Sequence, residues 1–256
     1  MLKLRVIPTL LWKNLSLVKG VGFESWRQVG TVLPSIKVYN TRDVDELILL
    51  DISATKEERT PDYEEISELS SECFVPLTIG GGVNSIEIIR NLLKAGADKV
   101  TINTSSYQHP ELISEAANRF GSQCIVASID VRLKKHGQYE CFSHCGTRAT
   151  GKDPVQWAKE VELLGAGELL ITSIERDGSM EGYDIPLLES VTNSVKIPVI
   201  ASGGAGNPEH ILKAIVSGNA SAVAAASMFH FTEQTPNEVK AYLAGQGIPV
   251  RNSNIR

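Results

Sequence analysis

The sequence has few of the features that mark secreted, membrane-bound or nucleic-acid-binding proteins. Its 256 residues include four cysteines, and only 6% of them are aromatic. The 25 basic and 30 acidic residues leave a formal net charge of −5, without any run of lysine and arginine. A basic stripe is the electrostatic signature of proteins that bind nucleic acids or anionic membranes, so we expect neither partner.

A long hydrophobic run is also missing. The apolar stretch within MLKLRVIPTLLWKN is too short and too interrupted for a signal peptide or a membrane span. We therefore expect a cytoplasmic protein. Cys141 and Cys145 have His144 between them, but no second pair of metal ligands accompanies them, and Cys73 and Cys124 lie in helical and strand patterns. We expect reduced thiols, no metal and no cofactor.

Short apolar runs alternate with amphipathic helical patterns along the whole chain. Helical patterns include 62–73, 85–95 and 153–164, and the apolar runs lie near residues 4–10, 46–51, 76–80, 98–102, 123–129, 167–172, 197–202 and 221–226. Strands that are apolar without alternation are buried on both faces, as in a parallel sheet covered by helices. Eight such units predict a single (β/α)8 (TIM) barrel domain over residues 1–256, with a doubly wound open sheet as the alternative.

The chain contains an internal repeat. VPLTIGGGVNSIEIIRNLLKAGADKVTINTSS, residues 75–106, resembles IPVIASGGAGNPEHILKAIVSGNASAVAAASM, residues 197–228. Two long similar halves predict a barrel built from two half-barrels, whereas a solenoid needs several short repeats. The longest irregular segments are expected after the first and fifth strands, at about residues 11–30 and 131–151.

Each half places small residues where strands of such a barrel end, which is where its active sites lie. Glycine clusters at 80–82 and 203–204 are each followed, one unit later, by a pair of small residues, Asn103-Thr104 and Ala226-Ser227. Glycines let a backbone approach a ligand closely, and free N–H groups there bind phosphate. The pair of clusters predicts a substrate with a phosphate at each end. The alternative is that these glycines only make tight turns.

Charged residues follow and precede the apolar runs. Asp130 stands at the end of one run, where partial burial would tune it for proton transfer, unless it only caps a loop. At the opposite ends of four runs, charges of alternating sign form a set that either pairs simply or surrounds the barrel axis as a gate. These residues are Arg5, Glu46, Lys99 and Glu168.

Motifs throughout the chain are specific to one family. They include RVIP, DELILLDI, GGGV, GADKVTINT, GAGELL, RDG, GYD, IASGGAG and FHF. By these motifs the chain resembles the cyclase subunits of imidazole glycerol phosphate synthase, from histidine biosynthesis. The resemblance implies a TIM barrel that acts with a glutaminase subunit and receives ammonia from it.

The resemblance also implies roles for individual residues. Lys19 would lie on a substrate loop, Asp130 would be catalytic, and Asp98 and Gln123 would lie on the face that docks the glutaminase. The charged set would form the ammonia gate. The phosphates of the substrate would bind at Gly82, Asn103 and Thr104 on one side, and at Asp177, Gly178, Gly204, Ala226 and Ser227 on the other.

The opening stretch departs from the family pattern. Family members use two aspartates as general acid and base, one from each half, but this chain has Leu11 where the first aspartate is expected. The loop glycine is replaced by Leu15, so the loop backbone is expected to differ. Leucine cannot transfer protons, and losing one acid–base group costs about 10²–10⁴-fold in rate.

Three functions fit these features. The favoured one is a paralogue that conducts ammonia, together with a glutaminase and a sugar amidotransferase, for amidation of an acetamido sugar of surface polysaccharides. The alternative is a true cyclase of histidine biosynthesis, in which Lys19 or Asn14 covers for the missing aspartate. A weaker third function is a non-catalytic phosphosugar-binding protein, which would have no glutaminase partner.

Overall fold

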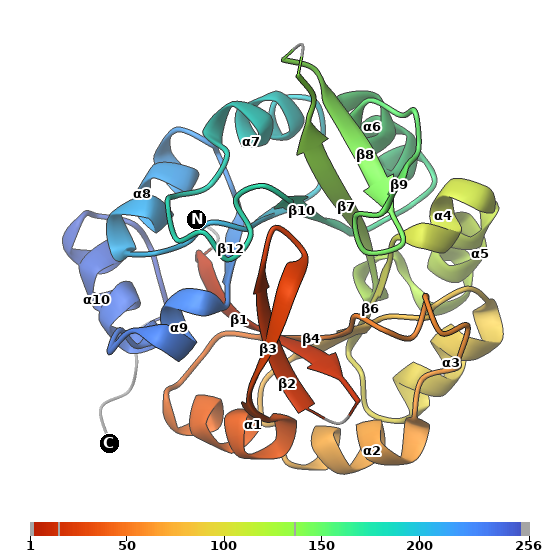
Figure 1. The fold of residues 1–256 in the computed structure, drawn as a ribbon, viewed down its shortest axis with the longest axis horizontal. Helices are drawn as coiled ribbons and strands as arrows, with labels where there is room; N and C mark the ends of the chain where they lie inside the picture. Colours follow the sequence, from red (N-terminus) through yellow and green to blue (C-terminus); the bar gives the residue numbers. More distant parts are fainter. Residues whose placement is uncertain (1–2, 15, 136, 252–256) are drawn as a thin grey trace.

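The computed structural model describes residues 3–14, 16–135 and 137–251. Within them, parallel strands close into a barrel with helices around its outside (Figure 1). Pairing of β1 with β12 and of β7 with β10 completes the ring, so the predicted (β/α)8 barrel is confirmed and the open sheet is wrong. The barrel strands, in spatial order, are β1 (Arg5–Lys13), β4 (Leu47–Asp51), β5 (Leu77–Gly80), β6 (Lys99–Ile102), β7 (Ile125–Leu133), β10 (Glu168–Ser173), β11 (Val199–Ser202) and β12 (Ala222–Ala225).

The helices begin where the sequence supplies caps. Side chains of Asp62, Ser85, Asp153 and Asn207 each accept a hydrogen bond from the backbone N–H three residues later, which satisfies an otherwise unpaired donor. The helices are α1 (Val32–Thr41), α2 (Tyr63–Ser71), α3 (Ile86–Lys94), α4 (Thr104–Gln108), α5 (Glu111–Phe120), the 3₁₀ turn η1 (Ser122–Cys124), α6 (Pro154–Leu163), α7 (Ile185–Thr192), α8 (Pro208–Val216), α9 (Ser227–Phe231) and α10 (Pro236–Gly245). None of the helices in the described residues has the length and apolar content needed to cross a bilayer.

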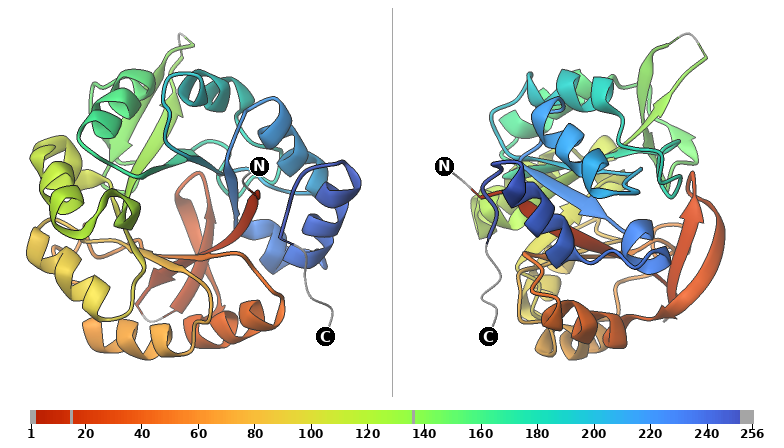
Figure 2. Two further views of the ribbon diagram at one scale, coloured as in Figure 1. Left: turned by 180° about the vertical axis from the view of Figure 1, so that it is seen from behind. Right: turned by 90° about the vertical axis from the view of Figure 1, so that its left-hand side faces the viewer.

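Two regions expected to be irregular are instead β-hairpins. β1 continues beyond the barrel and pairs with β2 (Ser16–Val21), which pairs with β3 (Glu24–Thr31). β7 likewise continues and pairs with β8 (Tyr139–Ser143), followed by β9 (Arg148–Ala149). Both hairpins project from the same end of the barrel, on the right of the right-hand view in Figure 2. Each long strand offers its free edge to the segment that follows it, which turns a predicted loop into antiparallel sheet.

The turn between β1 and β2 fits the sequence without a glycine. Lys13 pairs with Ser16, and Asn14 has a φ of 49°, a left-handed conformation that asparagine tolerates better than most residues. The expected effect of Leu15 on this loop falls on a residue outside those described.

Successive inward-facing residues build layers along the barrel axis. Because alternate residues of a strand share a face, β1 directs Arg5, Ile7, Thr9 and Leu11 inward from the floor, its amino end, to the mouth, its carboxyl end. Above the charged floor lies an apolar layer that is separate from the larger core between barrel and helices. It consists of Ile7, Ile48, Val126, Leu170, Ile200, Ala222 and Ala224.

We predict that Ile89→Ala destabilises the fold by about 2–5 kcal/mol, because it leaves a cavity under α3. Ile89 is fully buried on the barrel-facing side of this helix. Urea unfolding followed by circular dichroism measures the change. The exposed Lys94 on the same helix serves as the control, since Lys94→Ala should alter stability by only a few tenths of a kcal/mol. Equal effects of the two substitutions would contradict the assigned packing.

Candidate active site

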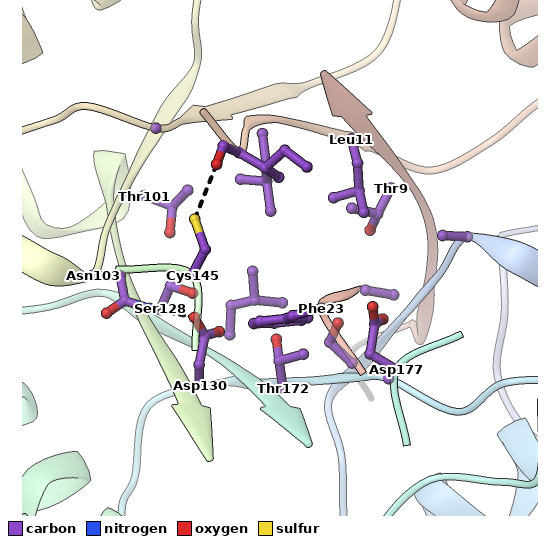
Figure 3. A pocket seen from close by; sticks show the side chains of 18 of the residues that line it. Thr9, Leu11, Phe23, Thr101, Asn103, Ser128, Asp130, Cys145, Thr172 and Asp177 are labelled. Carbon is purple, nitrogen blue, oxygen red and sulfur yellow. Dashed lines mark hydrogen bonds between the residues drawn. The ribbon is translucent and has the colours of Figure 1, made fainter. Parts of the chain in front are cut away.

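A single cavity at the mouth of the barrel contains the residues that the sequence singled out. Asp130 and Leu11 line it from opposite sides, as Figure 3 shows. The cavity is also lined by every residue predicted to bind phosphate, namely Gly82, Asn103, Thr104, Asp177, Gly178, Gly204, Ala226 and Ser227. Residues of both halves of the chain therefore meet in one space.

Asp130 has the environment expected of a proton-transfer group. It lies near the end of the barrel part of β7, beside Thr172 of β10, and is almost fully buried. Asn103 donates a hydrogen bond from Nδ2 to Asp130 Oδ2 at 2.7 Å. Burial and the nearby carboxylate of Asp177 raise the pKa of Asp130 to about 7, against the opposing effect of the Asn103 hydrogen bond. Asp130 can thus exchange a proton near neutral pH.

A second titratable pair lies beside this group. Lys19 is buried on β2, and its Nζ donates to the backbone oxygen of Thr9 at 2.8 Å. Burial lowers the pKa of Lys19 to about 7, while the charge of Asp177 opposes this shift. The pKa of Asp177 is raised to about 6 by burial, which outweighs the attraction of Lys19. Lys19 was predicted on a substrate loop, but it lies on a strand behind the cavity lining rather than in it.

Leu11 makes one wall of the mouth apolar. It pairs with Val18 in the hairpin and with Leu50 of β4, and it is 8% exposed. Asp130 holds the corresponding place at the base of the other hairpin, where it pairs with Phe142. The two hairpins therefore begin with an aliphatic side chain on one side of the mouth and a carboxyl on the other.

The glycines predicted to approach a ligand also approach neighbouring protein. A side chain at Gly178, with a φ of +73°, would meet the backbone oxygen of Gly20 in β2 at 2.1 Å. At Gly204, with a φ of +108°, it would meet the backbone oxygen of Gly182 at 2.2 Å. Tight packing thus accounts for these two glycines by itself, and phosphate binding has to be argued from the cavity they line.

Two polar groups on the Gly82 side of the cavity already have partners within the protein, whereas Asn103 Oδ1 is buried without a hydrogen-bond partner among the described residues. The backbone N–H of Gly82 donates to Thr55 Oγ1 at 3.3 Å, and Thr104 Oγ1 accepts from the backbone N–H of His144 at 3.0 Å. The β8–β9 turn that carries His144 therefore rests directly on this side of the cavity.

The sequence analysis missed three residues that cover the mouth. Phe23 and Trp26, from the β2–β3 hairpin, line the cavity, and Gly22 N bonds to Asp177 O at 2.9 Å, which fixes the hairpin to the opposite rim. Cys145 also lines the cavity, and its thiol donates to Ile52 O at 3.0 Å (Figure 3). Reading residues 11–30 as a loop hid this hairpin; the alternation of buried and exposed residues that normally marks a strand is weak there.

The four charged residues at the floor form a closed ring of ion pairs. Arg5 bonds to Glu46 at 2.8 Å and to Glu168, and Lys99 contacts Glu46 and Glu168, both at 3.0 Å. Burial disfavours the charge of Arg5, but its two carboxylate partners raise its pKa above the usual value. The residues pair with one another and in doing so encircle the axis; their role as a gate stays a prediction.

Asp98 and Gln123, which the resemblance assigns to the glutaminase interface, lie at the floor of the barrel, and their role in docking stays a prediction. They precede β6 and β7, and both are exposed. Asp98 also has a structural contact, since its carboxylate accepts from the backbone N–H of Leu77 at 2.8 Å. In the part of the chain that the structure describes, no three histidine, cysteine, aspartate or glutamate side chains gather as metal ligands, and the cysteines are free thiols.

The closed parallel barrel, with titratable groups at its mouth and an ion-pair ring at its floor, belongs to the class of (β/α)8 barrels, whose active sites lie at the carboxyl ends of the strands. A family model described as histidine biosynthesis protein matches residues 5–235. The imidazole glycerol phosphate synthase subunit HisF of Chloroherpeton thalassium is 48% identical over 251 residues, which cover 98% of this chain and 100% of that protein. The chain therefore belongs to the histidine biosynthesis protein family and, within it, to the HisF family. The resemblance seen in the motifs is confirmed.

We predict that Asp130→Asn stabilises the protein increasingly as the pH rises from about 4 to about 8. In the folded protein the pKa of Asp130 is raised to about 7, above its value in the unfolded chain. The carboxyl therefore contributes most to stability below its unfolded pKa, and this contribution to the free energy of unfolding is lost as the pH rises through 7. Asparagine keeps a polar side chain next to Asn103 without the buried charge. Urea unfolding at several pH values measures the difference from wild type.

The exposed Glu115 of α5 provides the control, since Glu115→Gln should give a nearly constant difference over this range. If the difference in unfolding free energy between Asp130→Asn and wild type were constant or decreased with pH, the protein would stabilise the ionised form of Asp130 better than its burial indicates.

Proposed function

We propose that this protein is the ammonia-using subunit of a glutamine amidotransferase complex, with a glutaminase bound at its floor. The observation that carries the proposal is the closed ring of Arg5, Glu46, Lys99 and Glu168, directly below an apolar layer and on the axis that leads to Asp130. Neutral ammonia crosses an apolar layer at far lower cost than ammonium or other ions, because burying an unpaired charge is expensive. Ammonia delivered at the floor would reach the mouth without mixing with solvent.

The substrate at the mouth is proposed to carry a phosphate at each end. Support comes from one cavity, which is lined by Gly82 and Thr104 and by Gly204 and Ser227, the two glycines being at repeat-related positions. Binding the two ends would hold the middle of the substrate between Asp130 and the Lys19–Asp177 pair. The resting contacts of Thr104 and Asn103 would have to be exchanged for contacts with the ligand.

For the reaction itself, the comparisons support ring closure to imidazole glycerol phosphate in histidine biosynthesis, the first candidate. The relative carries that synthase's name, and the alignment spans nearly all of both chains. Asp130 would be one proton-transfer group. Asp177, which lines the cavity and has a pKa near 6, would be the other, and Lys19 would act on it only as a buried neighbouring charge. Asn14, considered earlier for this role, lies at the hairpin turn and does not line the cavity.

Leu11 favours a second candidate, ammonia delivery for amidation of an acetamido sugar. An apolar wall opposite Asp130 removes one of two carboxyl groups from the place where a cyclase of this family is expected to use both. In this candidate a sugar amidotransferase would be the additional partner, and the ring and the floor would keep their roles. A second gene in the same genome encoding aspartate at this position would support it.

Affinity capture from the native host, followed by a glutaminase assay, tests the partner. Glutaminase activity that co-elutes with the tagged barrel would support the proposal. Its repeated absence, with the barrel folded and intact, would contradict the proposal and favour a phosphosugar-binding protein without a partner.

We predict that Lys99→Gln lowers the yield of ammonia-derived product per glutamine hydrolysed, while the reaction with free ammonium is unchanged. The substitution removes a charge that bridges Glu46 and Glu168, so the ring loses two of its contacts and ammonia escapes at the inlet. The two yields are measured on the captured complex. Lys94→Gln, on the exposed side of α3, is the control. A Lys99→Gln complex with an unchanged yield from glutamine would make the ring purely structural.

We predict that Leu11→Asp raises cyclase turnover with ammonium by about 10²-fold, the usual contribution of one acid–base group. The gain should be incomplete, because Trp12 and the hairpin still differ from the family pattern. Steady-state assays compare wild type, Leu11→Asp and Leu11→Asn, the last being polar without a titratable group. Asp130→Asn should abolish whatever turnover is seen. If the wild type turns over fast and Leu11→Asp does not improve it, the second acid–base role belongs fully to other residues. If neither the wild type nor Leu11→Asp shows turnover, the result favours the sugar candidate.

A further inference from the structure

A large aromatic side chain stands almost free on the floor of the barrel. Phe74 lies in the loop between α2 and β5 and is 78% exposed. A single exposed apolar side chain is ordinary on a protein surface, and by itself it implies nothing. The loop around Phe74 supplies the second observation.

Asn40 holds this loop from both sides of Phe74. Its Nδ2 donates to the backbone oxygen of Glu72 at 2.6 Å, and its Oδ1 accepts from the backbone N–H of Phe74 at 3.2 Å. Asn40 comes from the end of α1, so the clamp joins two neighbouring helix ends. A loop fixed by side-chain hydrogen bonds presents the Phe74 ring in a defined place, which lowers the entropy that a partner would otherwise have to overcome.

The position of Phe74 is continuous with the ammonia inlet. Loops that precede three adjacent strands, β5, β6 and β7, carry Phe74, Asp98 and Gln123. The carboxylate of Asp98 bonds to the backbone N–H of Leu77, which ties the first two of these loops together, and the next residue, Lys99, belongs to the ring. These loops lie on the face seen in the left-hand view of Figure 2, opposite the hairpins.

We propose that Phe74 is the apolar anchor of the glutaminase subunit and that Asn40 is the residue that positions it. This inference rests on the proposed function. A partner that delivers ammonia must exclude water around the inlet, where Asp98, Gln123 and the ion pair of Lys37 with Glu72 at 3.4 Å are polar and exposed. Among the described residues of the three loops, Phe74 is the exposed large apolar side chain, and a pocket on the partner that buries it would exclude water from one side of the interface.

The test measures binding of the glutaminase recovered from the native complex to purified variants of this chain. Phe74→Ala should raise the dissociation constant at least about tenfold, because truncating an anchor side chain commonly weakens binding by that factor or more. Phe74→Leu should retain much of the affinity. Asn40→Ala should weaken binding by a smaller factor with Phe74 still in place. Leu133→Ala, which truncates an apolar side chain 47% exposed on the β7–β8 hairpin at the opposite end of the barrel, is the control and should bind as wild type does.

The outcomes separate this inference from the proposed function. Phe74→Ala and Phe74→Leu should melt like wild type, because Phe74 contributes little to the core, and every variant should keep the reaction with free ammonium. If wild type binds the glutaminase and Phe74→Ala binds equally well, the anchor is disproved and the proposed function stands. If wild type binds no glutaminase, both fail. If Phe74 instead mediates association of two copies of this chain, sedimentation will show a dimer that Phe74→Ala abolishes, which also overturns the inference.

Discussion

The ring of ion pairs at the floor is the interaction on which the rest of the barrel depends. Arg5 and Lys99 each bridge Glu46 and Glu168, so four segments that are distant in sequence meet at one level of the axis. Buried charges tolerate little misalignment, because an unpaired one is costly. Fixing Arg5 at this level fixes which residues of β1 face inward above it, and thereby sets the apolar layer and the side chain that reaches the mouth.

At the mouth, burial is used to bring dissimilar groups to similar pKa values. Burial raises the pKa values of Asp130 and Asp177 and lowers the pKa of Lys19, so that two carboxyls and one amine titrate between about 6 and 7. The hairpin that carries Lys19 excludes water, and its attachment through Gly22 to the backbone of Asp177 keeps it there. The burial that shifts these pKa values also disfavours the folded state, because it removes ionisable groups from water. Such a cost in stability is common where function competes with stability.

The fold was predictable because barrel strands buried on both faces are uniformly apolar, and because the two halves repeat. The caps at Asp62, Ser85 and Asp153 are local signals that needed no tertiary context. The hairpins were not predictable, since β2 and β3 are held by the free edge of β1 rather than by their own pattern. For the same reason Lys19 was expected on a loop, and Phe23 was not noticed as a residue that covers the mouth. The contacts of Gly178 and Gly204 likewise depend on segments far away in sequence.

The correspondence between Leu11 and Asp130 bears on how such a protein changes over evolutionary time. Each half-barrel ends its first strand at the base of a hairpin, so the mouth contains two equivalent positions that mutate independently. A substitution at one of them alters the chemistry offered to the substrate while the floor, the apolar layer and the other half keep their structure. Because the ring at the floor is built from both halves, one substitution at the mouth leaves the frame that both halves share unchanged.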